Sequence, residues 1–173
     1  AEIMDIFNND VSGSSPAARK NQVIYDEGTQ NTGLSIALDD QGVVQARIGD
    51  QGSVSTVFSE NSIRDGAWHH LVVTFGDSPK AFKMYLDGQL MNQPVIHSSG
   101  VISLHLDDPS LGSITGTSLF PGYGFYKGFL DDLRIYERGL DAVEVVNVFE
   151  GDFTNNGYLD FLAIEKPEIV TKS

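Results

Sequence analysis

Residues 65–75, DGAWHHLVVTF, are the stretch of this chain that decides its fold. The Asp-Gly pair is typical of a tight turn, and the residues after it open with Trp-His-His and continue as an apolar run. The stretch therefore predicts a turn that leads into a buried strand. Because His69 and His70 are adjacent in that strand, their side chains point to opposite faces and cannot chelate one metal ion together.

Short apolar runs of the same kind occupy most of the chain, separated by turn signals rich in Gly, Asn, Asp and Ser. The predicted strands lie at residues 3–7, 22–25, 34–38, 43–48, 54–58, 68–75, 82–86 and 128–136. Short strands at a spacing of about 8–12 residues are typical of an antiparallel all-β sandwich.

One short helix is predicted near the end of this array. Asp141 and Glu144 have the spacing of a capping box, and Gly151 is a natural C-terminal stop. The apolar face of the helix would contain Ala142, Val145, Val146 and Phe149. We expect the helix to lie across one edge of a domain formed by residues 1–150, with residues 151–173 as an appendage or linker.

Three motifs, in this order, resemble the laminin G-like domains of the concanavalin A-like lectin/glucanase superfamily. They are Trp68-His69-His70, Tyr85-Leu86-Asp87-Gly88 and DDLRIY at residues 131–136. The resemblance covers roughly residues 3–149. It implies a jelly-roll β-sandwich of two antiparallel sheets with one short C-terminal helix, and it implies a binding module rather than an enzyme.

Two departures from that family bear on the prediction. Its domains usually begin with one or two strands before the equivalent of Ile3. Either the domain is truncated, or a later segment such as residues 158–164 supplies the missing strand. The enzymes of the superfamily carry a Glu-x-Asp-x-x-Glu strand, and this chain has no such run. It also lacks cysteine and a Gly-x-Ser-x-Gly elbow, so we expect no catalytic residues in this domain.

The composition of the chain limits the classes of partner that it can bind. The net charge of −13 disfavours nucleic acid and anionic membrane surfaces, whose phosphates need basic residues. No apolar run reaches the ~18 residues of a membrane span, so membrane insertion is not expected. The absence of cysteine excludes disulfides and thiolate metal sites. We expect an extracellular or cell-surface location, in a bacterium, as one covalent part of a larger multidomain protein.

The closing strand carries a candidate metal ligand, Asp131. Period-two alternation divides that strand into one face with Phe129, Asp131, Leu133 and Ile135 and another with Leu130, Asp132, Arg134 and Tyr136. Asp131 is thus predicted in line with core residues, where a carboxylate needs partners. It is either a hydrogen-bond hub, with His69 as a candidate partner, or a ligand of a structural Ca²⁺ such as similar domains often carry near the ends of the chain.

The tail contains a second, weaker calcium candidate. Asp152, Thr154, Asn156, Gly157 and Asp160 match the first, third, fifth, sixth and ninth positions of an EF-hand-like loop, and resemble half of a dockerin-type repeat. The twelfth position should be acidic but is Ala163, which predicts poor affinity. A plain Asn-Gly turn is the alternative interpretation of this loop.

An aromatic loop at residues 120–126 holds the candidate ligand-binding residues Tyr123, Phe125 and Tyr126. Sugar rings stack on exposed aromatic faces, although aromatic side chains in Gly-rich loops also pack inward. Trp68 is expected in the core or at its rim rather than as a sugar platform. The function predicted is carbohydrate binding by a lectin-like module. The alternatives are a structural or adhesive protein-interaction domain and, third, a glycan-active enzyme, whose paired carboxylates we do not find.

Overall fold

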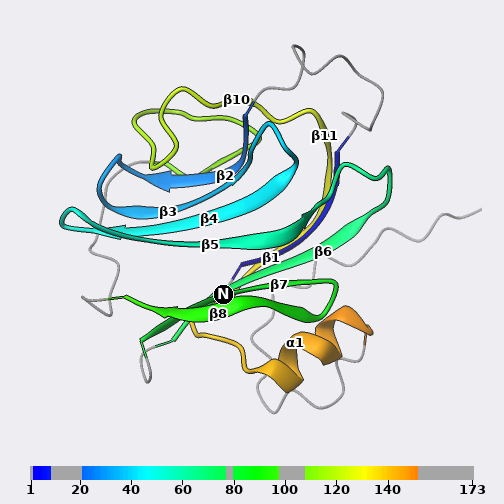
Figure 1. The fold of residues 1–173 in the computed structure, drawn as a ribbon. Helices are drawn as coiled ribbons and strands as arrows, with labels where there is room; N and C mark the ends of the chain where they lie inside the picture. Colours follow the sequence, from blue (N-terminus) through cyan, green and yellow to red (C-terminus); the bar gives the residue numbers. More distant parts are fainter. Residues whose placement is uncertain (1, 9–20, 77–79, 98–107, 152–173) are drawn as a thin grey trace, which may run out of the picture.

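The computed structural model describes residues 2–8, 21–76, 80–97 and 108–151, and these residues form two β-sheets packed face to face with one helix outside them (Figure 1). The first sheet has the order β11 (Gly128–Ile135), β1 (Glu2–Asn8), β6 (His69–Phe75), β7 (Ala81–Leu86) and β8 (Gln89–Ile96). The second has the order β10 (Gly124–Phe125), β2 (Gln22–Gly28), β3 (Gly33–Leu38), β4 (Val43–Asp50) and β5 (Ser53–Ser62), and β9 (Ser110–Leu111) also pairs with β2.

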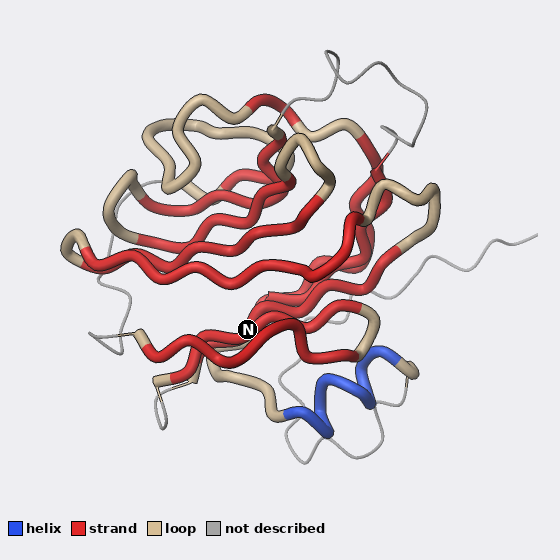
Figure 2. The backbone as a smooth tube through the Cα atoms, in the orientation of Figure 1, coloured by secondary structure: helices blue, strands red, loops and turns tan. Residues whose placement is uncertain are grey.

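The strand pairing confirms the jelly-roll sandwich of two antiparallel sheets. Every pair among the described strands is antiparallel except the two-residue contact of β10 with β2. Figure 2 shows the strands stacked in layers, with the helix outside them. The prediction missed β8, because its Pro94 and polar residues weaken the strand signal. The turn before it is nevertheless encoded, since Asp87 and Gly88 both have positive φ, as a tight hairpin connection requires.

The main core lies between the two sheets. Its buried side chains alternate along the strands of both sheets, and the largest of them are Tyr25, Phe82, Met4, Ile6, Ile24, Ile36, Leu38, Ile48, Ile63 and Leu71. Burial of one Leu, Ile or Phe side chain contributes about 1.5–3 kcal/mol, so this layer supplies most of the favourable free energy of folding.

No helix among the described residues is long and apolar enough to cross a membrane.

Part of the second sheet is buried on both faces. All six residues of β3 are buried, although residues 34–38 alternate in polarity. The reason is that the loop after β9 folds over the outer face, where Phe120 packs against Val23 and Ala37. Tyr123 then packs on Phe120, with 4.9 Å between ring centroids.

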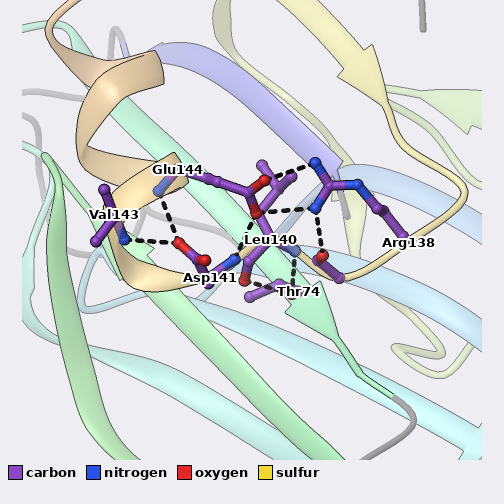
Figure 3. Close-up of polar contacts among 7 residues, drawn as sticks. Thr74, Arg138, Leu140, Asp141, Val143 and Glu144 are labelled. Atoms are coloured by element: carbon purple, nitrogen blue, oxygen red, sulfur yellow. Dashed lines mark hydrogen bonds and ion pairs between the residues drawn. The ribbon is translucent and has the colours of Figure 1, made fainter. Parts of the chain in front are cut away.

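The helix α1 (Ala142–Phe149) begins with the predicted capping box (Figure 3). The Asp141 carboxylate accepts hydrogen bonds of 2.9 Å from the backbone N–H groups of Val143 and Glu144, and Glu144 accepts one of 2.9 Å from the Asp141 N–H. Arg138 adds two hydrogen bonds to Glu144, at 2.8 and 2.6 Å. The Leu140 N–H donates to Thr74 Oγ1 at 3.2 Å, which joins the start of the helix to β6.

The position of α1 corrects two details of the prediction. Its buried side chains are Val145 and Val148, whereas Ala142, Val146 and Phe149 are exposed. It also covers the outer face of the first sheet rather than an edge of the sandwich (Figure 1). The covered residues of the first sheet are Ile3, Val72 and Tyr85. The division at residue 150 and the edge strand at 158–164 stay predictions, because residues 152–173 lie outside the described residues.

Candidate functional site

His69 connects its own strand, β6, to two turns: the turn at residue 65 and the Leu-Asp-Gly turn at residues 86–88. Its Nδ1 lies 2.8 Å from Asp87 Oδ2, and its Nε2 lies 3.0 Å from Asp65 Oδ1. Asp87 Oδ1 also accepts a 2.9 Å hydrogen bond from the His70 N–H. Two of the three motifs that carried the family resemblance, Trp-His-His and Tyr-Leu-Asp-Gly, therefore meet in one structural network that fixes β6 against the β7–β8 hairpin.

The electrostatics of this network favour a charged imidazole. Partial burial alone would lower the pKa of His69, but the hydrogen bonds to Asp87 and Asp65 outweigh it and raise that pKa above its ordinary value. A protonated ring donates from both nitrogens, one to each carboxylate. His69 thus acts as a bridge between two turns, and the predicted pair of His69 with Asp131 is wrong.

The closing strand differs from the prediction because it contains a β-bulge. Asp132 has a φ of 53°, and the pairing of β1 with β11 shifts register between Ile3 and Asp5. Leu130 lies opposite Ile6 and packs against the main core, so Phe129 and Asp131 point away from that core and are exposed. The bulge interrupts period-two alternation after Asp131, so Arg134, opposite Ile3, joins Asp131, opposite Asp5, on this outer face.

The described residues place no further acidic or histidine ligands around the calcium candidate Asp131. Within the described ranges, no group of three or more His, Cys, Asp or Glu side chains is placed to hold a metal ion. Asp131 Oδ1 instead accepts a 2.8 Å hydrogen bond from the Asp132 N–H. The tail candidates Asp152, Thr154, Asn156 and Asp160 lie outside the described residues.

The three aromatic ligand candidates have three different environments. Phe125 is 77% exposed, whereas Tyr123 is half-buried on Phe120. Tyr126 packs against the main core, and its N–H donates to the Gly112 carbonyl at 2.9 Å. The structure thus leaves Phe125, and in part Tyr123, available to a ligand, while Tyr126 holds the loop in place.

Phe125 begins a row of residues that crosses the outer face of the second sheet. Through successive strand pairs, the row runs Phe125, Val23, Ala37, Gln45 and Phe58. The loop covers the middle of the row at Val23 and Ala37. Beyond the loop, Gln45 is half-buried and Phe58 is 47% exposed, so an apolar ring faces solvent beside an amide.

A second row lies beside the first and contributes a guanidinium group. It contains Asp26, Ser35, Arg47 and Thr56. Arg47 donates a 2.7 Å hydrogen bond to the Leu119 carbonyl and stacks 4.1 Å from the centroid of the Phe120 ring. Both contacts fix the side chain between the loop and the open part of the sheet, because a planar guanidinium can stack and donate at once.

Tyr123 borders the same surface. Burial raises the pKa of its hydroxyl, the nearby Arg47 lowers it, and the nearby carboxylates of Asp39 and Asp40 raise it further. The phenol is therefore protonated at neutral pH and can donate a hydrogen bond. We call Gln45, Arg47, Thr56, Phe58 and Tyr123 the β4–β5 surface.

The β4–β5 surface combines an exposed ring with amide, guanidinium and hydroxyl donors on a rigid sheet. The sequence analysis missed four of its five residues. The alternation in β4 indicates that Gln45 and Arg47 share a face, but only the strand register brings Phe58 beside them, and only loop docking adds Tyr123. Trp68, by contrast, lies as expected at a rim, where it is 51% exposed.

These features together define a lectin-like jelly roll. The family model of the concanavalin A-like lectin/glucanases superfamily matches residues 13–146, so the chain belongs to that superfamily. No curated protein matches the chain.

Solved structures show the same fold at low identity. The receptor-binding domain of botulinum neurotoxin type G is 11% identical with a TM-score of 0.60, and the alignment covers 86% of this chain and 37% of that one. The CBM40 domain of the Ruminococcus gnavus IT-sialidase is 16% identical with a TM-score of 0.61, and the alignment covers 86% of this chain and 80% of that domain. A structure of that CBM40 bound to α2,3 sialyllactose has a TM-score of 0.62. The chain thus spans little more than a third of the toxin domain and most of the CBM40 domain.

Proposed function

We propose that this domain is a non-catalytic carbohydrate-binding module and that the β4–β5 surface holds the glycan. The observation that carries the proposal is the exposed Phe58 ring beside Gln45 and the fixed Arg47. A pyranose ring stacks its C–H groups on an aromatic face, and its hydroxyl groups bind planar amide and guanidinium groups. The neighbours' names support the same function, since both are receptor- or carbohydrate-binding domains.

The rigidity of the Gln45 and Arg47 side chains is the second observation that supports the proposal. Gln45 Nε2 donates to Asp39 Oδ2 at 3.1 Å, and Arg47 is held by the Leu119 carbonyl and the Phe120 ring. Side chains already fixed in the free protein lose little conformational entropy on binding, which matters for weak ligands such as single sugars. The carboxylates nearest to this surface are already engaged, which favours a binding function over catalysis. Asp39 accepts hydrogen bonds from Gln45 and from the backbone N–H groups of Gln41 and Val43, and Asp40 accepts one from the Gln41 side chain.

The test is calorimetric titration of the chain with neutral oligosaccharides and with sialyllactose. For the glycan that binds best, Phe58→Ala should raise the Kd about fivefold or more, which corresponds to the loss of about 1 kcal/mol of ring stacking. Gln45→Ala should act in the same direction. Phe129→Ala is the matched control, because this ring has a similar exposure on the other sheet.

The proposal fails if Phe129→Ala abolishes binding while Phe58→Ala leaves it unchanged, or if no glycan in the panel binds. Hydrolysis of any oligosaccharide during the titration would favour a glycan-active enzyme instead. We further propose that the module belongs to a secreted or surface protein of several domains, and fractionation of the source cells tests this location.

A further inference from the structure

A second exposed aromatic surface lies on the other sheet, away from the β4–β5 surface. Trp68 is 51% exposed and Phe129 is 59% exposed. Their ring centroids lie 6.5 Å apart with 35° between the ring planes, so the rings form one tilted platform. Trp68 stands just before β6 and Phe129 lies in β11, so both belong to the first sheet and to its outer side.

A row of ionisable side chains crosses the same outer face beside these rings. Asp131, which shares a face with Phe129, lies opposite Asp5, and Asp5 lies opposite His70. The His70 ring in turn contacts Phe149 of α1, with 5.6 Å between centroids. The row therefore fills the space between the aromatic pair and the helix. We call Trp68, Phe129, Asp5, Asp131 and Asp132 the acidic-aromatic surface.

The charge on this surface is unbalanced toward the negative. Asp132 is paired with Arg134 at 2.6 Å, whereas Asp5 and Asp131 lie across the strand pair from one another. Burial raises the pKa of Asp5, His70 lowers it, the neighbouring Asp132 and Asp131 raise it further, and Arg134 lowers it. Burial lowers the pKa of His70, so this imidazole is neutral at neutral pH and does not compensate the carboxylates.

We propose that the acidic-aromatic surface binds a basic segment of a partner protein, with an arginine or lysine side chain on the Trp68–Phe129 platform. A guanidinium or ammonium group over an aromatic face gains a cation–π attraction, and the adjacent carboxylates neutralise its positive charge. Charge complementarity selects this class of partner, because Asp132 is already paired with Arg134 and a further cation would relieve the repulsion between Asp5 and Asp131. The site is independent of the β4–β5 surface, so the module would hold a glycan and a protein on different sheets.

The test uses a fluorescein-labelled hexa-arginine peptide and the full chain at low ionic strength, with binding followed by anisotropy. Trp68 is the only tryptophan in the chain, so its own fluorescence reports contact at this surface directly. The peptide should bind, change the Trp68 emission and lose affinity as salt is added. A hexa-glutamine peptide is the uncharged control.

Two pairs of matched variants locate the contact. Phe129→Ala and Asp131→Asn should each raise the Kd of the peptide about fivefold or more, the size of one partly desolvated cation–π or charge contact. Phe58→Ala and Glu60→Gln remove an exposed ring and an exposed carboxylate on the second sheet and should leave the Kd unchanged. All four positions are exposed, so the variants should fold, and the midpoint of urea unfolding checks this.

Four results would overturn the proposal. Equal losses in Asp131→Asn and Glu60→Gln would mean that only the net charge attracts the peptide. An unchanged Kd in Phe129→Ala, or equal binding of hexa-glutamine, would remove the aromatic or the ionic part of the argument. A Trp68 response to neutral glycans but not to hexa-arginine would make this face a sugar site instead.

Discussion

The outer faces of the two sheets are covered by different segments, and the comparison shows how the open surfaces arise. On the second sheet, the cover is an aromatic loop whose Phe120 packs on Val23 and Ala37. On the first sheet, the cover is α1, whose Val145 and Val148 pack on the outer face. Each cover stops partway across its sheet. The loop leaves a surface rich in hydrogen-bond donors around Arg47, and the helix leaves an acidic row with two exposed rings.

Phe120→Ala tests the loop cover and should have the largest effect on stability. The side chain is fully buried and carries the stacking of both Tyr123 and Arg47. Its removal should lower the free energy of unfolding by about 3–5 kcal/mol, measured by urea unfolding. Phe125→Ala, at an exposed position of the same loop, is the control and should cost less than about 0.5 kcal/mol. Equal costs would mean that the loop does not act as a cover.

His69→Gln tests the ionic network, which belongs to the first sheet. Loss of hydrogen bonds to two carboxylates should lower the free energy of unfolding by about 1.5–3 kcal/mol near pH 6. The folded-state pKa of His69 is raised, so its charge contributes fully below the ordinary pKa of about 6.5 and is lost as the pH rises through the folded value.

The difference in stability between wild type and His69→Gln should therefore shrink from pH 6 toward pH 9, again by urea unfolding. Comparison with His69→Gln isolates this contribution from that of His70, whose lowered pKa acts in the opposite direction. A difference that grows with pH would show that His69 is neutral in the folded protein, contrary to the bridge described above.

Asp141→Ala tests the helix cover and should have a smaller effect. Loss of the N-cap side chain should cost about 1 kcal/mol and loosen α1 over Ile3, Val72 and Tyr85. Hydrogen exchange should then rise in the helix and in the first sheet beneath it, and not in β3 or β4. Faster exchange in both sheets would mean that the two covers are not independent.

Calcium should have the smallest effect on the described domain, because its described residues place no group of three His, Cys, Asp or Glu side chains around Asp131. The midpoint of thermal unfolding of the full chain is measured with excess calcium and with a chelator. The difference between these two midpoints should be the same in wild type and Asp131→Asn, whether or not it is zero. A shift that disappears in Asp152→Asn would place calcium in the tail loop. A shift lost in Asp131→Asn alone would restore Asp131 as a ligand.

The sequence predicted the fold because its strongest signals are local. The Asp141 and Glu144 capping box, the Asp-Gly turns and the alternating strands depend on near neighbours, and two of the three family motifs meet in the His69 network. The sites depend on features that are not local. Packing of Leu130 on the core set Asp131 on the outer face, the bulge at Asp132 brought Arg134 to the same face, and strand register brought Phe58 beside Gln45. Neither relation can be seen from alternation within one strand.

The central claim, that glycans bind the β4–β5 surface, is tested most directly by amide chemical shifts during a glycan titration of the isotope-labelled chain. The account predicts that the shifting amides cluster at Gln45, Arg47, Thr56, Phe58 and Tyr123, with residues 128–135 unchanged. Shifts confined to residues 128–135 and the neighbourhood of Trp68, with the β4–β5 surface silent, would contradict it.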